Sequence, residues 1–300
     1  MELQNKTNII LCFRPIRIKE LPDEYDELIA NNYYNISDEF HKLRHSLEET
    51  FELTQCDQLF KNRYKDILPY EHSRVKLIPI DDCDSGYINA NFITGLHNPR
   101  EYIACQGPLK TTINDHWRMI WEQNVMIIVM LTDLIERGIT KCDRYWPSNL
   151  DETEMYGNIS VCVTDCVHMD SYDLRYIQLN KKDEIRSIKH YAFKMWDDHT
   201  VPTNCELLID FIRLIRSEYR PECHGPILVH CSAGVGRSGT FIALDRLLQQ
   251  FDKVSFYGYL DIYGTVLDMR RCRDRMVQNE HQYLFIYRCL KEEYEKRSGK

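Results

Sequence analysis

Short apolar runs alternate along this chain with longer segments in which apolar residues recur every three or four positions. The run at 125–131, Val-Met-Ile-Ile-Val-Met-Leu, has the length of a strand and no polar residue, which is typical of a strand covered on both faces. Similar runs predict strands at 102–105, 159–164, 174–179 and 227–230, and periodic segments predict helices at 203–218, 239–251, 260–272 and 280–295. This mixture predicts an α/β fold in which helices flank a sheet.

The N-terminal part has a different pattern. Residues 1–22, with two prolines and mixed charges, predict a connector, and the domain itself is expected over 23–297. Helical patterns follow at 23–30 and 37–47, the second with Ser37 or Asp38 as N-cap. Although 300 residues could hold two domains, we expect one, because the motifs described below spread over nearly the whole chain.

Composition limits the classes of partner. With 43% hydrophobic and 28% charged residues the chain is typical of a globular protein, and its net charge of −8 opposes attraction to nucleic acid or to an anionic membrane surface. We therefore expect no nucleic-acid partner, and any anion site must be local. No run approaches the roughly 20 apolar residues of a membrane span, and the start lacks the apolar core of a secretion signal. No membrane contact is expected from this segment.

The 12 cysteines indicate a reducing compartment. They are scattered in apolar contexts, which predicts reduced, buried thiols of a cytosolic protein. Cys162, Cys166 and His168 could form half of a metal site, but no second pair with zinc-like spacing is present and the segment alternates like a strand. The interpretation as structural thiols is favoured, and we expect no metal or other cofactor.

Residues 226–240 read as a buried strand, a loop of small residues and an amphipathic helix, with Cys231 between strand and helix. Inward N–H groups of such a loop, together with the helix N-terminus, can hold a phosphate dianion, and the same field favours the thiolate form of a cysteine. Arg237, six residues after Cys231, can bind two phosphate oxygens with its planar fork. A lone cysteine would be read as a core residue, but this setting predicts a nucleophile for phosphoryl transfer without a metal ion.

The segment 230–239, His-Cys-Ser-Ala-Gly-Val-Gly-Arg-Ser-Gly, resembles the signature loop of tyrosine-specific protein phosphatases. The resemblance continues at 61–66, 73–75, 87–91, 102–108, 141–147 and 278–282. It implies a single catalytic domain with a highly twisted mixed β-sheet flanked by helices, which hydrolyses phosphotyrosine in proteins through a cysteinyl-phosphate intermediate. Residues 14–47 also resemble the stretch that leads into the cytoplasmic domain of receptor-type members, particularly those with one catalytic domain. We therefore expect a cytoplasmic location, either as a free protein or as the intracellular domain of a single-pass receptor; the sequence carries no signal for an oligomeric state.

The resemblance also implies roles for particular residues. The catalytic set would be Cys231 as nucleophile, Arg237 as phosphate clamp, Asp198 as general acid and base, Gln278 as the residue that positions water, and Ser238 as a hydroxyl donor to the cysteine. The substrate-binding set would be Tyr64, Asp66, Ser232, Ala233, Gly234, Val235, Gly236, Arg237 and Gln282, and the supporting set His230, Glu136, Lys141 and Trp196. Within these sets, Tyr64 would stack on the substrate ring, Asp66 would hold the substrate backbone and Glu136 would pair with Arg237. Without the resemblance, Gln278 and Lys141 would be interpreted as surface residues, Asp198 as part of a solvated turn and Tyr64 as a core residue.

The expected acid loop, 196–202, departs from the family pattern at two positions. Asp197 stands where proline is usual and Thr200 where glycine is usual, so closure of the loop over substrate should be rarer or slower. Asp197 beside Asp198 should in turn favour the protonated acid by repulsion. We expect reduced but real turnover.

Basic residues follow the helix expected at 260–272. The bulky Arg275 stands where a small residue in some relatives opens a gateway to a second phosphotyrosine pocket, and it should narrow that gateway. Arg270, Arg271 and Arg273 would either attract acidic residues next to the target tyrosine or form a solvated helix end.

Two other functions remain open from the sequence. A low-activity domain that only binds phosphotyrosine is suggested by the altered acid loop, but the residues of the catalytic set are all present. A phosphoinositide phosphatase would be expected to carry lysines in the loop to meet additional phosphates, and residues 232–236 contain none.

Overall fold

The structure, a computed structural model, describes residues 14–45, 51–54, 59–196, 200–254 and 258–299. Eight strands form one mixed sheet in the order β2-β3-β11-β4-β10-β9-β8-β7. Their bounds are β2 Ala90–Ile93, β3 Tyr102–Cys105, β4 Ile127–Met130, β7 Thr153–Tyr156, β8 Ile159–His168, β9 Tyr172–Lys181, β10 Glu184–Phe193 and β11 Ile227–His230. The four central strands β3, β11, β4 and β10 are parallel, and the outer pairs are antiparallel.

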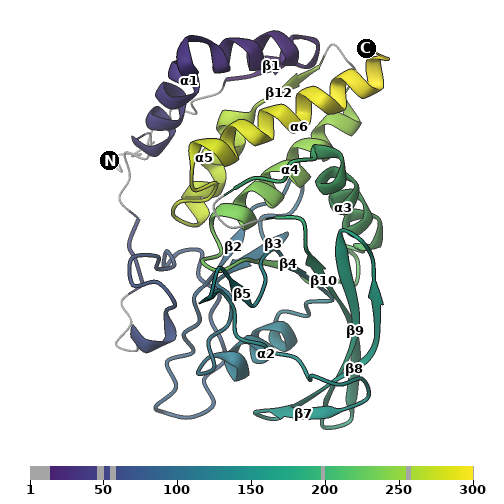
Figure 1. The fold of residues 1–300 in the computed structure, drawn as a ribbon. Coiled ribbons are helices and arrows are strands. Elements are labelled where there is room, and N and C mark those ends of the chain that lie inside the picture. The colour runs from purple at the N-terminus through teal and green to yellow at the C-terminus, as the bar shows by residue number, and fades with distance from the viewer. Residues whose placement is uncertain (1–13, 46–50, 55–58, 197–199, 255–257, 300) are drawn as a thin grey trace, which may run out of the picture.

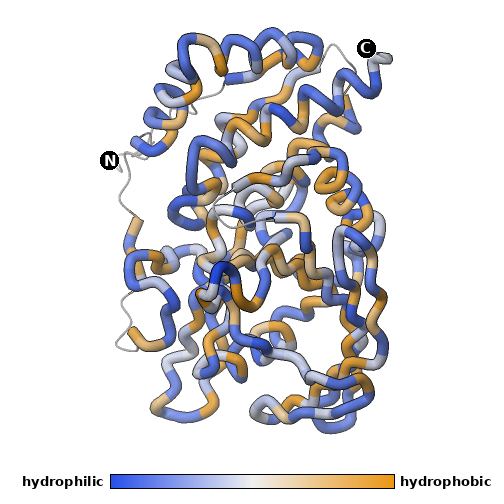
Figure 2. Tube along the Cα trace, in the orientation of Figure 1, coloured by the Kyte–Doolittle hydropathy of each residue, from blue (hydrophilic) through white to orange (hydrophobic). Residues whose placement is uncertain are grey.

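Helices cover both faces of this sheet. On one face lie α3 Cys205–Glu218, α4 Gly236–Lys253, α5 Ile262–Cys272 and α6 Glu280–Ser298, and on the other α2 Ile113–Glu122 (Figure 1). The predicted run at 125–131 became the central strand β4, whose side chains alternate between the two cores: Val129 packs with the helices α3 to α6, and Ile128 packs with α2. Apolar positions accordingly gather in the middle of the molecule (Figure 2). The expected α/β domain with a twisted mixed sheet flanked by helices is confirmed.

Part of the stretch expected to be a connector packs onto the body. The short strand β1 Ile16–Arg17 pairs with β12 Tyr259–Leu260, and the 3-10 helix η1 Ile18–Glu20 follows. Ile18 and Leu21 are buried in the helical core. These residues carry apolar side chains between charged ones, a pattern too short to be distinguished from a loop in the sequence.

The helix α1 Leu21–His45 corrects the prediction of an N-cap at Ser37 or Asp38. Both residues lie inside a helical turn, and the break comes earlier, at 30–33, where Asn31, Asn32 and Tyr33 have φ of 52°, 56° and 64°. Asparagine tolerates this left-handed conformation better than most residues do. The two predicted helices therefore exist, but the break between them is shorter than expected.

The cysteines are less uniformly buried than expected. All ten within the described residues are free thiols, but Cys83 and Cys223 are exposed and Cys162, Cys166 and Cys272 are half-buried. Cys162 lies on β8 with its side chain on the face that the core does not cover. Apolar neighbours in the sequence therefore do not bury this thiol. Within the same residues no group of three or more His, Cys, Asp or Glu is placed to hold a metal ion. None of the described helices combines the length and apolar character needed to cross a membrane.

Candidate active site

The predicted strand, loop and helix carry Cys231 at the point where the sheet ends. β11 ends at His230, α4 begins at Gly236, and the loop between them is short. Cys231 is 5% exposed, and its Sγ accepts a hydrogen bond from Gly234 N at 3.2 Å. Gly234 has φ of 72°, and a Cβ there would lie 2.1 Å from Cys105 O, so only glycine fits this bend.

The carbonyl groups of residues 232–235 are all bound by donors outside the loop. The pairs are Gly107 N to Ser232 O (2.9 Å), Arg273 Nη2 to Ala233 O (3.0 Å), Arg273 Nε to Gly234 O (3.0 Å) and Val277 N to Val235 O (3.1 Å). Because the N–H and C=O of a trans peptide point in opposite directions, the N–H groups of 233–236 face the inside of the loop. Such an array at a helix N-terminus is an anion site.

Arg273 corrects the sequence interpretation of the basic helix end. It is fully buried, and besides the two loop carbonyls it donates to Asn91 Oδ1 and Asn89 Oδ1, both at 2.7 Å. Within the described residues its side-chain hydrogen-bond partners are all neutral oxygens, so a positive charge with no bonded carboxylate among them lies directly behind the loop. Arg270 is also buried, with Nε on Met276 O and Nη2 on Val277 O. Neither residue can meet a substrate, because tertiary contacts, invisible in the local sequence, enclose both.

Arg237 is held by a carboxylate in the expected way. Its Nη1 and Nη2 donate to Glu136 Oε1 and Oε2 at 2.6 and 2.9 Å, and Nη1 also donates to Leu131 O at 3.0 Å. Glu136 lies on the two-residue strand β5 Ile135–Glu136, which pairs with β6 Ile139–Thr140, and also accepts from Thr132 Oγ1. Burial raises the pKa of Glu136, but the contact with Arg237 more than offsets it, so the pKa lies below its ordinary value. The guanidinium is thus fixed beside the loop.

Tyr64 stands at the wall of the site. Its hydroxyl lies 2.9 Å from Ser232 Oγ, which donates to Lys141 O at 2.9 Å. A serine hydroxyl has one proton, so Tyr64 is the donor in the first bond. The neighbouring Arg63, which the sequence interpretation did not single out, fixes this segment through Gly107 O at 3.1 Å and other acceptors. Lys141 lines the pocket, and the middle of the acid loop that it was expected to face, residues 197–199, lies outside the described residues.

The two predicted glutamines meet across the start of α6. Gln282 Oε1 accepts from Gln278 N at 3.0 Å, and both side chains lie close enough to Gly236 that a Cβ there would meet them at 2.9 to 3.1 Å. Gln278 is exposed at the pocket rim, whereas Gln282 is buried. Ser238 is fully buried, and within the described residues its Oγ has no hydrogen-bond partner. The expected bond from Ser238 to the cysteine is therefore not formed in this structure.

The acid loop is described only at its two ends. Asp198, with Asp197, lies outside the described residues. Trp196 is buried, and its Nε1 donates to Thr200 O at 2.9 Å, so the two ends of the loop are tied together.

Asp66 has a partner that the sequence did not indicate. Arg275 Nη1 donates to its Oδ2 at 2.7 Å, and both side chains are substantially exposed. Arg275 also has φ of 57° and lines the pocket, so it stands at the mouth of the site. The carboxylate expected to hold a substrate backbone is thus occupied by a cation.

His230 lies behind the loop in a buried chain of hydrogen bonds. Its Nε2 is 2.8 Å from Tyr145 Oη and its Nδ1 is 3.2 Å from Cys231 O, while Tyr145 Oη is also 2.8 Å from His190 Nε2. Burial lowers the pKa of His230 to about 4 and that of His190 well below its ordinary value, so both imidazoles are neutral. Burial also raises the pKa of the neighbouring Cys105 thiol to about 12, which keeps this thiol protonated.

These features surround one cavity of about 250 Å³. It brings together the predicted residues Tyr64, Asp66, Glu136, Lys141, Cys231, Ser232, Ala233, Gly236, Arg237, Gln278 and Gln282. Gly234, Val235 and Ser238 are not among the residues that line this cavity. The sequence interpretation missed Arg273, Asn89 and Asn91, although the motif at 87–91 contains both asparagines.

Comparison with known proteins identifies relatives over most of the chain. The family described as protein-tyrosine phosphatase matches residues 58–292. The chain is 41% identical over 282 residues to receptor-type tyrosine-protein phosphatase F of Danio rerio, and 45% identical over 235 residues to receptor-type tyrosine-protein phosphatase eta of Mus musculus. These alignments cover 93% and 77% of the chain but only 14% and 18% of the relatives. The tyrosine-protein phosphatase Lar-like of Caenorhabditis elegans is 39% identical over 94% of the chain and 13% of its own length.

Proposed function

Because this chain belongs to the protein-tyrosine phosphatase family, we propose that it hydrolyses phosphotyrosine in proteins through a covalent phosphate on Cys231. The observation that carries the proposal is the orientation of the loop. Four successive carbonyls are bound from outside and four N–H groups face inward, beside a thiol and an arginine fixed by a glutamate. Donors held in this way stabilise the charge on the equatorial oxygens of a transferring phosphoryl group without reorganisation.

In the first step, Cys231 Sγ attacks phosphorus while the bond to the tyrosyl oxygen breaks. Arg237 binds two of the non-bridging oxygens, and Asp198 gives its proton to the leaving phenolate, whose pKa near 10 makes it a poor leaving group without protonation. The products of this step are the free tyrosine side chain and the cysteinyl phosphate.

In the second step, water attacks the cysteinyl phosphate and releases inorganic phosphate. Asp198 now takes the proton of the water, which Gln278 positions with Gln282 beside it. The buried hydroxyl of Ser238, which has no hydrogen-bond partner in the described part of the chain, would donate to the sulfur as negative charge returns to it.

Selection of tyrosine would come from the wall and mouth of the pocket. Tyr64, held by Ser232, would form one wall of the pocket and stack on the substrate ring. A phosphoserine side chain is shorter, so it would not bring its phosphorus past this wall to the sulfur. The partners are phosphotyrosine-containing proteins. As the named relatives are receptor-type enzymes, we also propose a cytoplasmic location as the catalytic part of a receptor.

The test is steady-state hydrolysis of matched phosphotyrosine and phosphoserine peptides beside a phosphoinositide, with Cys231→Ser as the control. We expect release of phosphate from the tyrosine peptide alone and none from the variant. Binding of the peptide without release would instead indicate a phosphotyrosine-binding domain, and faster release from the phosphoinositide would indicate a lipid phosphatase. Either result would overturn the proposal.

A further inference from the structure

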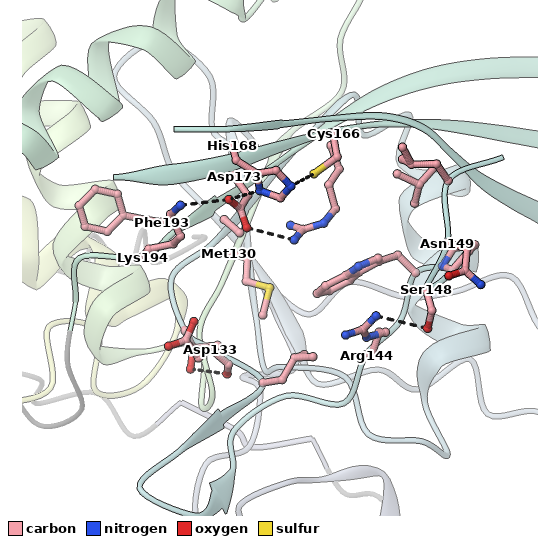
Figure 3. Close-up of a pocket in the computed structure, with 18 residues that line it drawn as sticks. Met130, Asp133, Arg144, Ser148, Asn149, Cys166, His168, Asp173, Phe193 and Lys194 are labelled. Carbon is pink, nitrogen blue, oxygen red and sulfur yellow. Dashed lines mark hydrogen bonds and ion pairs between the residues drawn. The ribbon is translucent and has the colours of Figure 1, made fainter. Parts of the chain in front are cut away.

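A second cavity has a volume of about 520 Å³, about twice that of the catalytic one. Its wall combines the ends of β4 and β10, strands β8 and β9 and the loop at 144–150 (Figure 3). The two cavities share no lining residue among those described. A concave site of this size, with apolar walls and a few converging polar groups, is the usual form of a site for a small molecule.

The polar side of this cavity is built around Asp173. Its Oδ1 lies 2.8 Å from His168 Nδ1 and 3.1 Å from Lys194 Nζ, and its Oδ2 accepts from Arg175 Nη2 at 3.2 Å (Figure 3). Burial raises the pKa of Asp173, but the bonds from His168 and Lys194 outweigh it and the pKa is lowered. The carboxylate is therefore ionised and fully engaged, and it offers nothing to a cationic ligand.

The cations of the lining outnumber its acids. The lining contains the cations Arg144, Arg175 and Lys194 and the carboxylates Asp133 and Asp173. Its formal charge is therefore positive in a chain whose net charge is −8. This surplus favours an anionic ligand over a cationic one.

One donor in the wall lacks an acceptor. Arg175 Nη1 is buried without a hydrogen-bond partner within the described residues, and the guanidinium lies 4.8 Å from the centre of the Trp146 ring. Arg144 lies 5.8 Å from the same ring and has one hydrogen bond, to Ser148 Oγ at 3.3 Å. A buried donor without an acceptor is unfavourable, and an oxygen of a ligand would bind it if the guanidinium turned toward the cavity. Two guanidiniums near one indole suit a planar ligand that carries a carboxylate.

The wall also has apolar members. Met130, Leu134 and Phe193 line the cavity together with its polar groups. An inorganic anion alone would leave this surface and most of the volume unused, whereas an aromatic body would cover it. We propose that this cavity binds a small aromatic carboxylate, with the carboxylate on Arg144 and Arg175 and the ring against Trp146 and the apolar wall.

Cys166 supplies a built-in reporter of occupancy. It lines the cavity, with Sγ 3.7 Å from His168 Nε2, whereas Cys83 and Cys223 are exposed elsewhere. The experiment measures the rate at which N-ethylmaleimide labels each cysteine, by peptide mass spectrometry, in rising concentrations of 2-naphthoate or of the neutral 2-naphthamide. We expect 2-naphthoate to slow labelling of Cys166 at least fivefold at saturation, with no change at Cys83 or Cys223, and 2-naphthamide to protect weakly or not at all.

Two variants locate the binding. Arg144→Met, at an exposed position with little structural role, should raise the half-saturating concentration of 2-naphthoate about tenfold. Arg175→Lys keeps the charge but loses the planar fork and should also weaken protection. Arg186→Met is the matched control, because Arg186 stacks on Trp121 at 3.9 Å outside this cavity and should leave protection unchanged.

Three outcomes would overturn the proposal. Equal protection by the acid and the amide would show that charge is not recognised. Protection confined to Cys231 would place the carboxylate in the catalytic loop instead. An unchanged half-saturating concentration in Arg144→Met and Arg175→Lys would remove the assigned donors. None of these results depends on whether the chain hydrolyses phosphotyrosine.

Discussion

Replacement of Arg273 by methionine tests whether the buried guanidinium behind the loop holds the loop carbonyls, and with them the anion site, in place. Arg273 gives four hydrogen bonds to buried neutral oxygens, two of them in the loop itself. Methionine fills much of the same volume but donates nothing, so those acceptors lose their partner. At about 1 kcal/mol each, the low end for a buried group left unsatisfied, the loss is about 4 kcal/mol. That is a large part of the 5–15 kcal/mol by which domains are stable.

The same substitution should weaken anion binding, because it removes the positive charge and frees the loop carbonyls to turn. Two measurements apply: urea unfolding for stability, and calorimetric titration with vanadate, a phosphate mimic, for the loop. We expect at least a tenfold loss of vanadate affinity in Arg273→Met. Arg273→Lys keeps the charge with fewer well-placed donors and should lie between the variant and the parent in both measurements.

Arg271→Met is the matched control. Arg271 is half-buried in the last turn of α5, two residues before Arg273, and its side chain has no hydrogen bond within the described residues. It should change stability by less than about 0.5 kcal/mol, the usual range for surface positions. If Arg273→Met were as stable as Arg271→Met and bound vanadate equally well, the orientation of the loop would not depend on the buried guanidinium, and the reasoning would fail.

Three further predictions concern the clamp, the mouth and the acid loop. Glu136 has a folded-state pKa below its ordinary 4.5, so its stabilising contribution is present above about pH 4.5 and is lost as the pH falls through the lowered value. In Glu136→Gln the free energy of unfolding should therefore fall less steeply between about pH 6 and pH 3. An unaltered slope would contradict this. Arg275→Ala breaks an exposed pair worth about 0–1 kcal/mol, so stability should hardly change while the KM for a phosphotyrosine peptide falls, because Asp66 is released for the peptide backbone. The KM for p-nitrophenyl phosphate, which has no backbone, should stay constant, and a parallel fall would refute the role of Asp66. Restoring proline at Asp197 and glycine at Thr200 should raise kcat by up to about tenfold, or about 1.4 kcal/mol of barrier, and an unchanged kcat would show that these residues do not limit loop closure.

The elements with the strongest local signal could be predicted from the sequence. Strands β3 and β11 have the predicted bounds, and the four C-terminal helices lie within three residues of theirs. β10 was missed because charged and polar residues, such as Arg186 and Lys189, interrupt its apolar face, although Ile188 and Tyr191 are buried. α2 was not predicted although its local signal is present, because Ile113, Trp117, Ile120 and Trp121 recur at helical spacing. The parallel pairing of β10 with β4, by contrast, joins segments far apart in the chain.

The candidate site likewise contains some residues whose placement follows from the local sequence and others whose placement does not. The cysteine, its loop and Arg237 form a contiguous motif, so their placement together follows from one strand, one turn and one helix. Arg273 looked like a solvent-exposed cation, because a charged residue at a helix end usually is one, and only the fold shows that it is enclosed. The contact of Arg275 with Asp66 joins residues 209 positions apart, which no local pattern records.

The buried chain through Tyr145 also fixes where each proton lies. Cys231 O can only accept, so Nδ1 of His230 carries hydrogen and Nε2 is left to accept from the hydroxyl of Tyr145. The tyrosine oxygen then accepts from Nε2 of His190, whose Nδ1 carries no hydrogen and has no hydrogen-bond partner among the residues that the structure describes. The two histidines are therefore opposite tautomers, and every hydrogen bond from His190 on β10 to the carbonyl of Cys231 has its donor on the β10 side, so the bond dipoles add along the chain.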